Sequence, residues 1–154
     1  MIAENLMQIL GEHPFFVGMR PEHIQLLAGC ASVTHFDADQ FILRQGEEAD
    51  KCYLIRYGKV SLEVYGPERG AIEVQTLEEG DVLGWSWLVP PHQWRLDARA
   101  LKMTRAIVLD GNRLREECER DHELGYELMK RFNQVMAENL EALRFQLINV
   151  YAIA

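Results

Sequence analysis

The spacing of apolar residues changes twice along the chain and divides it into three parts. In residues 1–29, apolar side chains recur at helical spacing, which predicts a helix over residues 3–10 and a second helix opened by Pro21. Residues 33–109 show short apolar runs separated by turn residues, which is typical of strands. Helical spacing returns from residue 110 onward. We therefore expect a helical lead, a strand region and C-terminal helices.

The strand region carries the period of two that a half-buried strand requires. Val60, Leu62 and Val64 alternate with neighbours that are polar or amphipathic. Turn residues recur at roughly every 8–12 residues, a spacing typical of sandwiches and barrels of short antiparallel strands. The predicted fold class is α+β, mainly β, in a single domain covering residues 1–154.

Two helices are expected after the strands. Asp110 or Asn112 can cap a short helix over residues 110–120, and Asp121 can cap a long helix over residues 122–151. The long helix carries two apolar stripes on different faces. The stripe expected to lie on the strand region consists of Leu124, Leu128, Phe132 and Val135.

The second stripe of the long helix follows the spacing of a coiled-coil seam, with alternating steps of four and three residues. Its members are Met129, Asn133, Met136, Leu140, Leu143, Leu147 and Val150. Left open, this seam would form a large apolar patch, so we expect a homodimer through the long helix. The alternative is that both stripes pack within one chain.

Composition narrows the class of protein and its compartment. The chain has 154 residues and a formal net charge of −8, which argues against autonomous nucleic-acid binding, because phosphate binding needs a basic face. Cys30, Cys52 and Cys118 form no close pair for a disulfide or a metal knuckle. The sequence shows neither a signal-peptide pattern nor an apolar run of about 20 residues, so a cytoplasmic protein without a membrane segment is expected.

A set of spaced residues in the strand region resembles a known family. The set comprises Phe36–Asp39, Ile42, Arg44, Gly46-Glu47, Asp50, Tyr53, Ile55, Gly58 and Val60, followed by Gly80–Gly84. With the helical lead and the long final helix, it resembles the cyclic-nucleotide-binding domain of the catabolite activator (Crp/Fnr-like) superfamily. That resemblance implies an antiparallel β-roll of the double-stranded β-helix (jelly-roll) type, with N-terminal helices and a long C-terminal helix. It also implies a ligand held by a cassette between Gly84 and Ala100.

The polar groups that this family uses for its ligand are replaced in this chain. The resemblance implies a glutamate for the ribose and an arginine for the cyclic phosphate, and these two positions hold Trp85 and Trp94. Arg95 stands one residue late, which turns a strand side chain to the opposite face, unless an insertion in the loop restores Arg95 to the phosphate-binding position. On the long helix, Leu143 and Arg144 stand where the family offers hydroxyl groups to the base. The candidate ligand-binding residues are Gly84, Trp85, Ser86, Trp87, Trp94, Arg95, Leu143 and Arg144.

These replacements leave two functions open, because indoles can either stack on a flat ligand or fill its cavity. One function is a non-enzymatic sensor or regulatory module whose ligand, a small anion or a nucleotide such as cAMP or cGMP, sits in the cassette. The alternative is a ligand-independent, dimeric interaction module on the same scaffold. The sequence predicts no catalytic group and no metal site, because its five histidines are scattered and no nucleophile–base order appears. The chain stops after the long helix, so we expect no DNA binding by itself.

Overall fold

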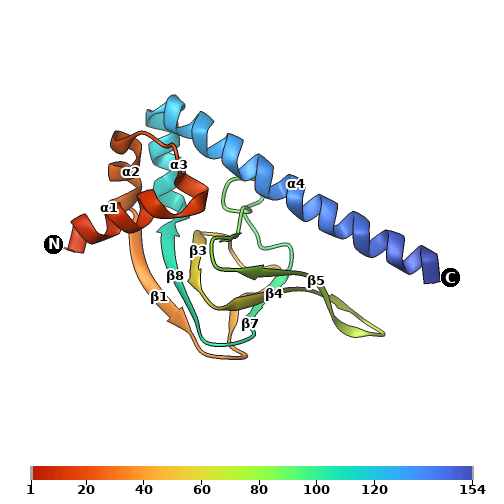
Figure 1. Ribbon diagram of the computed structural model, residues 1–154. Coiled ribbons are helices and arrows are strands. Elements are labelled where there is room, and N and C mark those ends of the chain that lie inside the picture. The colour runs from red at the N-terminus through yellow and green to blue at the C-terminus, as the bar shows by residue number, and fades with distance from the viewer. Residues whose placement is uncertain (1, 154) are drawn as a thin grey trace.

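The computed structural model describes residues 2–153, which follow the predicted order of helices, strands and helices (Figure 1). The helices are α1 (Ile2–Glu12), the 3₁₀ turn η1 (Pro14–Phe16), α2 (Pro21–Ala28), α3 (Gly111–Arg120) and α4 (His122–Ile153). The strands are β1 (Ala31–Phe36), β2 (Phe41–Leu43), β3 (Lys51–Tyr57), β4 (Lys59–Gly66), β5 (Gly70–Glu78), β6 (Val82–Leu83), β7 (Asp97–Ala100) and β8 (Thr104–Asp110). None of the helices within the described residues is long and apolar enough to span a bilayer.

Helix boundaries lie where local chemistry predicts them. Pro21 opens α2, at a position where its missing N–H is not needed. The Asp110 carboxylate caps α3 by accepting a hydrogen bond from the Asn112 amide at 3.0 Å. Asp121 caps α4 in the same way, accepting from the Leu124 amide at 3.2 Å. α2 and α4 begin at the predicted residues, α1 and α3 begin one residue from their predicted starts, and α1 and α4 each continue two residues past their expected ends.

The strands form two four-stranded antiparallel sheets. The first sheet has the order β1-β8-β3-β6 and the second has the order β2-β7-β4-β5. The predicted antiparallel β-roll is therefore confirmed. A core fills the space between the sheets, and its buried members include Tyr53, Ile55, Val60, Leu62 and Ala98.

Gly58 makes the tight connection from β3 to β4, as its place in the motif predicted. Its φ of +117° lies in the region that glycine adopts most readily. A Cβ at this position would come within 2.6 Å of the Thr104 Cα atom, so a larger residue would push β8 away. The turn therefore depends on glycine for both conformation and space.

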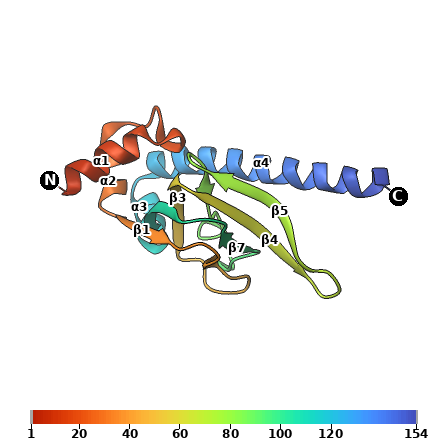
Figure 2. The same cartoon turned by 60° about the horizontal axis from the view of Figure 1, so that its bottom comes forward.

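Helices cover the outer face of the first sheet, where a second core forms. Leu54 and Ile107 of the sheet belong to the same buried cluster as Leu124, Leu128 and Phe132 of α4. The prediction that the stripe of Leu124, Leu128, Phe132 and Val135 packs on the strand region is therefore confirmed. Figures 1 and 2 both show α4 crossing on one side of the two sheets, with the β4–β5 hairpin running beneath its C-terminal half. In that half, the apolar side chains of the seam are exposed.

Candidate functional site: the cassette from Gly84 to Ala100

The cassette begins at Gly84, directly after the short strand β6. Gly84 has a φ of +98°, which turns the chain out of the strand. Two overlapping turns follow, in which the Leu88 amide donates to the Trp85 carbonyl at 3.0 Å and the Val89 amide donates to the Ser86 carbonyl at 3.3 Å. The segment is therefore a tight loop of turns, without a helix, before the chain returns to the roll at β7.

Trp94 enters the roll because of the register of the chain that leads into β7. Its amide donates to the Glu47 carbonyl and its carbonyl accepts from the Gly46 amide, both at 2.9 Å. After a bend at residues 95–96, the chain enters β7, and Leu96 packs against the same core cluster that contains Trp94 and Ala98. Ala98 is fully buried between the sheets, and Trp94 is 7% exposed in the same core.

The Trp94 indole is buried in the core of the roll and lines a small cavity beside the cassette. A cavity of about 40 Å³ remains beside the ring. That volume holds a few water molecules, whereas ligand pockets usually begin at roughly 300 Å³. Its walls are mostly aliphatic, and they include Leu43, Leu62, Leu77 and Leu83, with the polar residues Ser86 and Asn139.

Arg95 follows Trp94 in the chain but is not buried with it. Its side chain is exposed, and it is one of the residues that line the cavity. The guanidinium carbon lies 5.7 Å from the centre of a Trp85 ring, and one guanidinium nitrogen donates to the Pro90 carbonyl at 3.5 Å. The guanidinium is thus exposed and contacts Trp85 and Pro90 of the cassette, while Arg95 also lines the cavity.

Trp87 does not join the other two tryptophans. It is fully buried on the helix side of the first sheet, where its ring meets Phe132 edge to face at 5.3 Å between centroids. The Trp87 carbonyl accepts a hydrogen bond from Arg115 of α3. Trp87 is therefore a core residue that fastens the cassette to α3 and α4, while Trp85 is half-buried beside the cavity.

The α4 side chain that reaches the cavity is Asn139, which the sequence analysis missed. Leu143 and Arg144 are exposed and lie outside the lining. Asn139 follows Val135 by four residues and so continues the buried stripe, a helical signal that could have identified it. Of the predicted site residues, the structure brings together Gly84, Trp85, Ser86, Trp94 and, at the rim, Arg95, and it leaves Trp87, Leu143 and Arg144 apart.

Charged side chains next to the cassette form hydrogen bonds with the backbone and with one another on the outer face of the second sheet. Asp97 accepts a hydrogen bond from the Gln45 amide at 2.7 Å. On the same face, Glu63 accepts from Arg99 at 2.8 Å and from the Ser61 hydroxyl at 3.0 Å. The Arg99 guanidinium holds the pKa of Glu63 below its ordinary value. No carboxylate lines the cavity within the described part of the chain, so the cavity offers a ligand no acidic partner.

Comparison with known proteins identifies the family. The family model for the cyclic nucleotide-binding domain matches residues 33–121, more than half of the chain. The chain belongs to the cyclic nucleotide-binding domain family. The cGMP-dependent protein kinase egl-4 of Caenorhabditis briggsae is 30% identical to this domain over 81 residues, which are 51% of this chain and 11% of the kinase. The chain thus spans about a tenth of that relative's length.

Solved structures of cyclic nucleotide-binding domains share this fold. A cyclic nucleotide-binding protein from Geobacter metallireducens is 26% identical, covers 91% of this chain and 98% of its own, and has a TM-score of 0.77. The regulatory subunit of a cAMP-independent protein kinase A from Trypanosoma brucei is 24% identical, with coverage of 94% and 51% and a TM-score of 0.77. The sensor domain of the regulator DNR from Pseudomonas aeruginosa is 16% identical, with coverage of 90% and 93% and a TM-score of 0.71. As predicted, this cyclic nucleotide-binding domain is a regulatory, sensor-like module.

Proposed function

We propose that this domain is a non-enzymatic regulatory module that works as a dimer without binding cAMP or cGMP. The observation that carries the proposal is the Trp94 indole, which occupies the core of the roll and leaves about 40 Å³. The two positions that the resemblance assigns to phosphate and ribose hold Trp94 and Trp85, and the Arg95 side chain, which also lines the cavity, is exposed. The Trypanosoma brucei relative with the same fold is itself described as cAMP-independent.

Non-enzymatic character is supported by the chemistry of the cavity. Ser86 is the one hydroxyl-bearing residue in the lining, and no histidine or carboxylate lines the cavity with it among residues 2–153. A serine without an adjacent base is a weak nucleophile. Asn139 and Arg95 can donate hydrogen bonds, but neither is suited to abstract a proton from Ser86.

Cysteine chemistry supports a cytoplasmic location. Cys30 and Cys52 are free and buried, and Cys118 is free and partly buried. Burial raises the pKa of the Cys118 thiol to about 11, so that the thiol is protonated and poorly reactive at neutral pH. Unpaired thiols of this kind suit a reducing compartment.

The dimer would form through the seam of α4, with a second copy of this chain as the partner. Leu140, Leu147 and Val150 are 59%, 56% and 59% exposed, so the C-terminal half of the seam does not pack within its own chain, whereas Met136 packs partly against the core. An apolar strip of this length favours pairing with an identical strip, because both copies then remove it from water. The stripe that contains Phe132 already packs on the sheet, which leaves the seam for a partner.

A groove connects the cassette to the start of this seam. It has a volume of about 690 Å³ and lies between the cassette turn, α3 and the first half of α4. Leu88 and Val89 of the cassette line it together with Met129 and Met136 of the seam. A partner helix seated there would contact both elements, so a rearrangement of the cassette would change the dimer contact directly.

A gain-of-binding experiment tests the proposal. The wild type, the double variant Trp94→Arg with Trp85→Glu, and the single variant Trp85→Glu would each be titrated into a fluorescent cAMP analogue, after circular dichroism has shown that they fold. We expect saturable binding only from the double variant, because it removes the Trp94 ring and restores both polar groups. The single variant is the matched control, since its cavity is still filled. Tight binding by the wild type would contradict the proposal.

A sensor for a small ligand is the second candidate function. The residual cavity presents hydrogen-bonding groups of Ser86 and Asn139 beside the rings of Trp85 and Trp94. A small anion or nucleotide entering there would change the surroundings of both indoles and shift their emission. A saturable emission change with one member of a panel of small anions and nucleotides would favour this function, and an unchanged spectrum across the panel would favour the ligand-independent module.

A further inference from the structure

A second hollow lies on the outer face of the first sheet, at the end that the helices leave uncovered. Its volume is about 540 Å³, and its lining includes Val33, His35, Arg56, Met103 and Arg105. Figure 1 shows α1, α2 and α3 gathered at one end of β1 and β8, while the other end of these strands carries no helix. The hollow is therefore separate from the cavity beside the cassette, which lies between the two sheets.

The strand register places three basic side chains in a row across this hollow. Val33 of β1 lies opposite Ile107 of β8, and two residues further on His35 lies opposite Arg105. Ile107 packs beneath the helices on the outer face, so His35 and Arg105, at the same parity, point to that face as well. Arg56 is the residue that a bulge of β3 leaves unpaired, directly before the partner of Arg105. Three neighbouring strands, in the order β1-β8-β3, thus contribute one basic group each.

The two arginines of this row have no partner in the chain. Neither Arg56 nor Arg105 forms an ion pair or a side-chain hydrogen bond within residues 2–153, whereas Arg99 on the second sheet pairs with Glu63 at 2.8 Å. No acidic residue lines the hollow in the described part of the chain. Like charges that face each other on adjacent strands destabilise a sheet, and an anion bound between them removes that cost. The two guanidinium groups therefore form a site for an anion on a chain whose net charge is −8.

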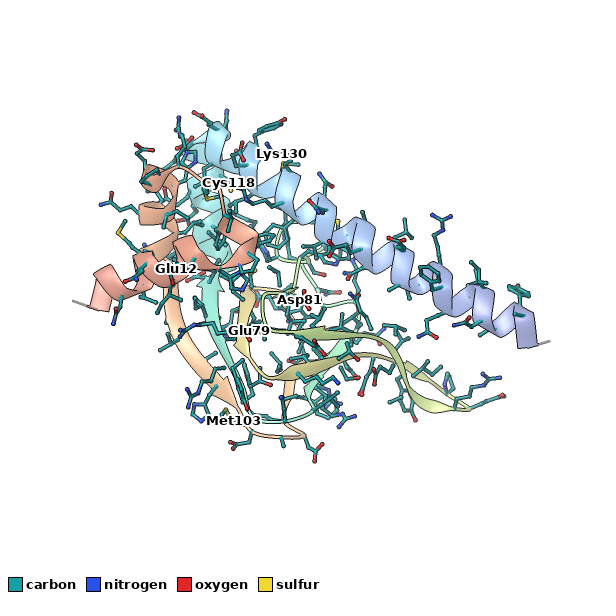
Figure 3. The ribbon with its side chains drawn as sticks, viewed as in Figure 1. Glu12, Glu79, Asp81, Met103, Cys118 and Lys130 are labelled. Carbon is teal, nitrogen blue, oxygen red and sulfur yellow. The ribbon has the colours of Figure 1, made fainter. Side chains whose placement is uncertain are left out.

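Asp81 is close to this part of β3 along the backbone, but its carboxylate serves another part of the fold. Its carbonyl accepts a hydrogen bond from the Ile55 amide at 2.9 Å, while its carboxylate accepts from the Glu78 amide at 2.8 Å. Asp81 lines a different cleft, between β5 and α4. Figure 3 shows Asp81 nearer to the helices than Met103, which marks the open end of the roll. The arginines of the hollow are thus left without a carboxylate.

Apolar side chains flank the basic row on two sides. Val33 is 64% exposed and Met103 is 38% exposed, and both line the hollow with the arginines. An organic ligand whose anionic end lies between the guanidinium groups can bury apolar surface against either side chain. A bare inorganic ion would leave both side chains in water. The volume of the hollow lies within the roughly 300–1,000 Å³ that small-molecule sites occupy.

We propose that this hollow binds a phosphate monoester of a small organic molecule, with the phosphate held between Arg56 and Arg105. A phosphate monoester carries a charge of about −1.5 to −2 at pH 7, which two guanidinium groups neutralise. Each guanidinium can donate two parallel hydrogen bonds to phosphate oxygens, and the His35 imidazole can donate one more. A single carboxylate would leave one arginine uncompensated. Nucleic acid fits less well, because it requires a longer basic face than two arginines and one histidine provide.

An NMR titration of the full-length ¹⁵N-labelled chain with phenyl phosphate, at constant ionic strength, tests the site. We expect saturable shifts of the amide signals of β1, β8 and the β3 bulge. Arg56→Gln with Arg105→Gln should weaken binding by at least about tenfold, because it removes both charge-assisted contacts. Lys51→Gln with Arg69→Gln is the matched control, since it changes the net charge equally at exposed positions outside the hollow. Equal weakening by both double variants would overturn the proposal.

Two related anions test which part of the ligand is recognised. Phenyl sulfate has the same shape as phenyl phosphate but only one negative charge, and we expect it to bind at least about threefold more weakly. Inorganic phosphate lacks the ring and should also bind more weakly, because it makes no contact with Val33 or Met103. Binding of phenyl sulfate as tight as that of phenyl phosphate would overturn recognition of a dianion. Equally tight binding of inorganic phosphate would overturn recognition of an organic ligand.

Two larger probes test whether the phosphate belongs to a small molecule. One is a flexible peptide that contains a single phosphoserine, and the other is a lipid vesicle that contains phosphatidic acid. Both present a phosphate monoester, so we expect each to bind no more tightly per phosphate than phenyl phosphate does. Binding of either probe that is at least about tenfold tighter, and that is lost in Arg56→Gln with Arg105→Gln, would overturn the assignment to a small molecule and favour a phosphoprotein or a membrane surface.

Discussion

A Cβ atom added to Gly84 would lie 2.9 Å from two carbons of the Trp94 ring, closer than the roughly 3.5–4 Å at which non-bonded carbons attract. The first residue of the cassette therefore makes room for an indole that enters ten residues later. In turn, the indole occupies the space behind the glycine. The buried position of the Trp94 ring therefore depends on the absence of a side chain at Gly84.

Gly84→Ala should destabilise the domain by about 1–3 kcal/mol, because the positive φ strains an alanine and its methyl group meets Trp94. Gly46→Ala is the matched control, since Gly46 has a φ of +90° but open space around its Cβ position. Urea denaturation of both variants gives the two losses. We expect the larger loss at Gly84, and equal losses would contradict the close packing of the ring.

Alanine substitutions should separate the roles of the three tryptophans. Trp87→Ala and Trp94→Ala remove buried rings and should each cost about 3–5 kcal/mol of stability. Trp85→Ala should cost less than about 1 kcal/mol, because this ring is only half-buried beside Arg95. Thermal melts of the three variants check the order. A loss for Trp85→Ala as large as that for Trp87→Ala would contradict the placement of these rings.

Local signals explain most of what the sequence predicts correctly. Pro21, Asp110 and Asp121 act on backbone groups within three residues of themselves, so helix starts are visible without the fold. Gly58 marks a turn through its own φ. Of the predicted alternation, Val60 and Leu62 lie in the core between the sheets, whereas Val64, past the bulge in β4, is exposed, and Ser61 and Glu63 are buried as well.

Tertiary relationships account for what the sequence does not show. Trp87 and Trp94 are close in the chain but enter different cores, because the turns of the cassette point them to opposite sides of the first sheet. Asn139 reaches the cavity only because α4 crosses the roll at that residue. Likewise, Arg56 and Arg105 become neighbours through the pairing of β3 with β8, which no local pattern reveals.

Charges placed in the α4 seam should dissociate the dimer. Leu140→Glu with Leu147→Glu would put four like charges into the paired interface, at a cost of several kcal/mol. Gln146→Glu with Asn149→Glu adds the same charge at exposed positions beside the seam and should leave the dimer intact. Light scattering at micromolar concentration gives the mass of each protein. A monomeric wild type would contradict the dimer.

The Glu63–Arg99 pair should make stability depend on pH. Arg99 lowers the pKa of Glu63 from its ordinary 4.5, so the pair stabilises the fold above that value, and this stability is lost as the pH falls through the folded pKa. Glu63→Gln should lower the free energy of unfolding by about 1.5–3 kcal/mol at pH 7. The difference from the wild type should shrink in denaturant titrations at about pH 3. A difference independent of pH would contradict this role.

Glu78→Gln is the control for the pH experiment. Glu78 forms an exposed ion pair with Lys59 at 3.8 Å, in which both side chains remain largely in water. Its substitution should change stability by less than about 1 kcal/mol at pH 7, because exposed pairs are screened by solvent. A loss as large as that for Glu63→Gln would contradict the claim that burial makes the Glu63–Arg99 pair more stabilising than an exposed ion pair.

Calorimetric titration of the wild-type domain with cAMP and cGMP tests the filled cavity most directly. The missing phosphate guanidinium and ribose carboxylate would each have supplied a charge-assisted hydrogen bond worth about 1.5–3 kcal/mol, which together correspond to roughly two to four decades in affinity. With Trp94 inside the roll as well, we expect no saturable heat, or a Kd weaker than about 10 µM. A sub-micromolar Kd for either nucleotide would contradict the account, because it would require Trp94 to leave the cavity and Arg95 to reach the phosphate.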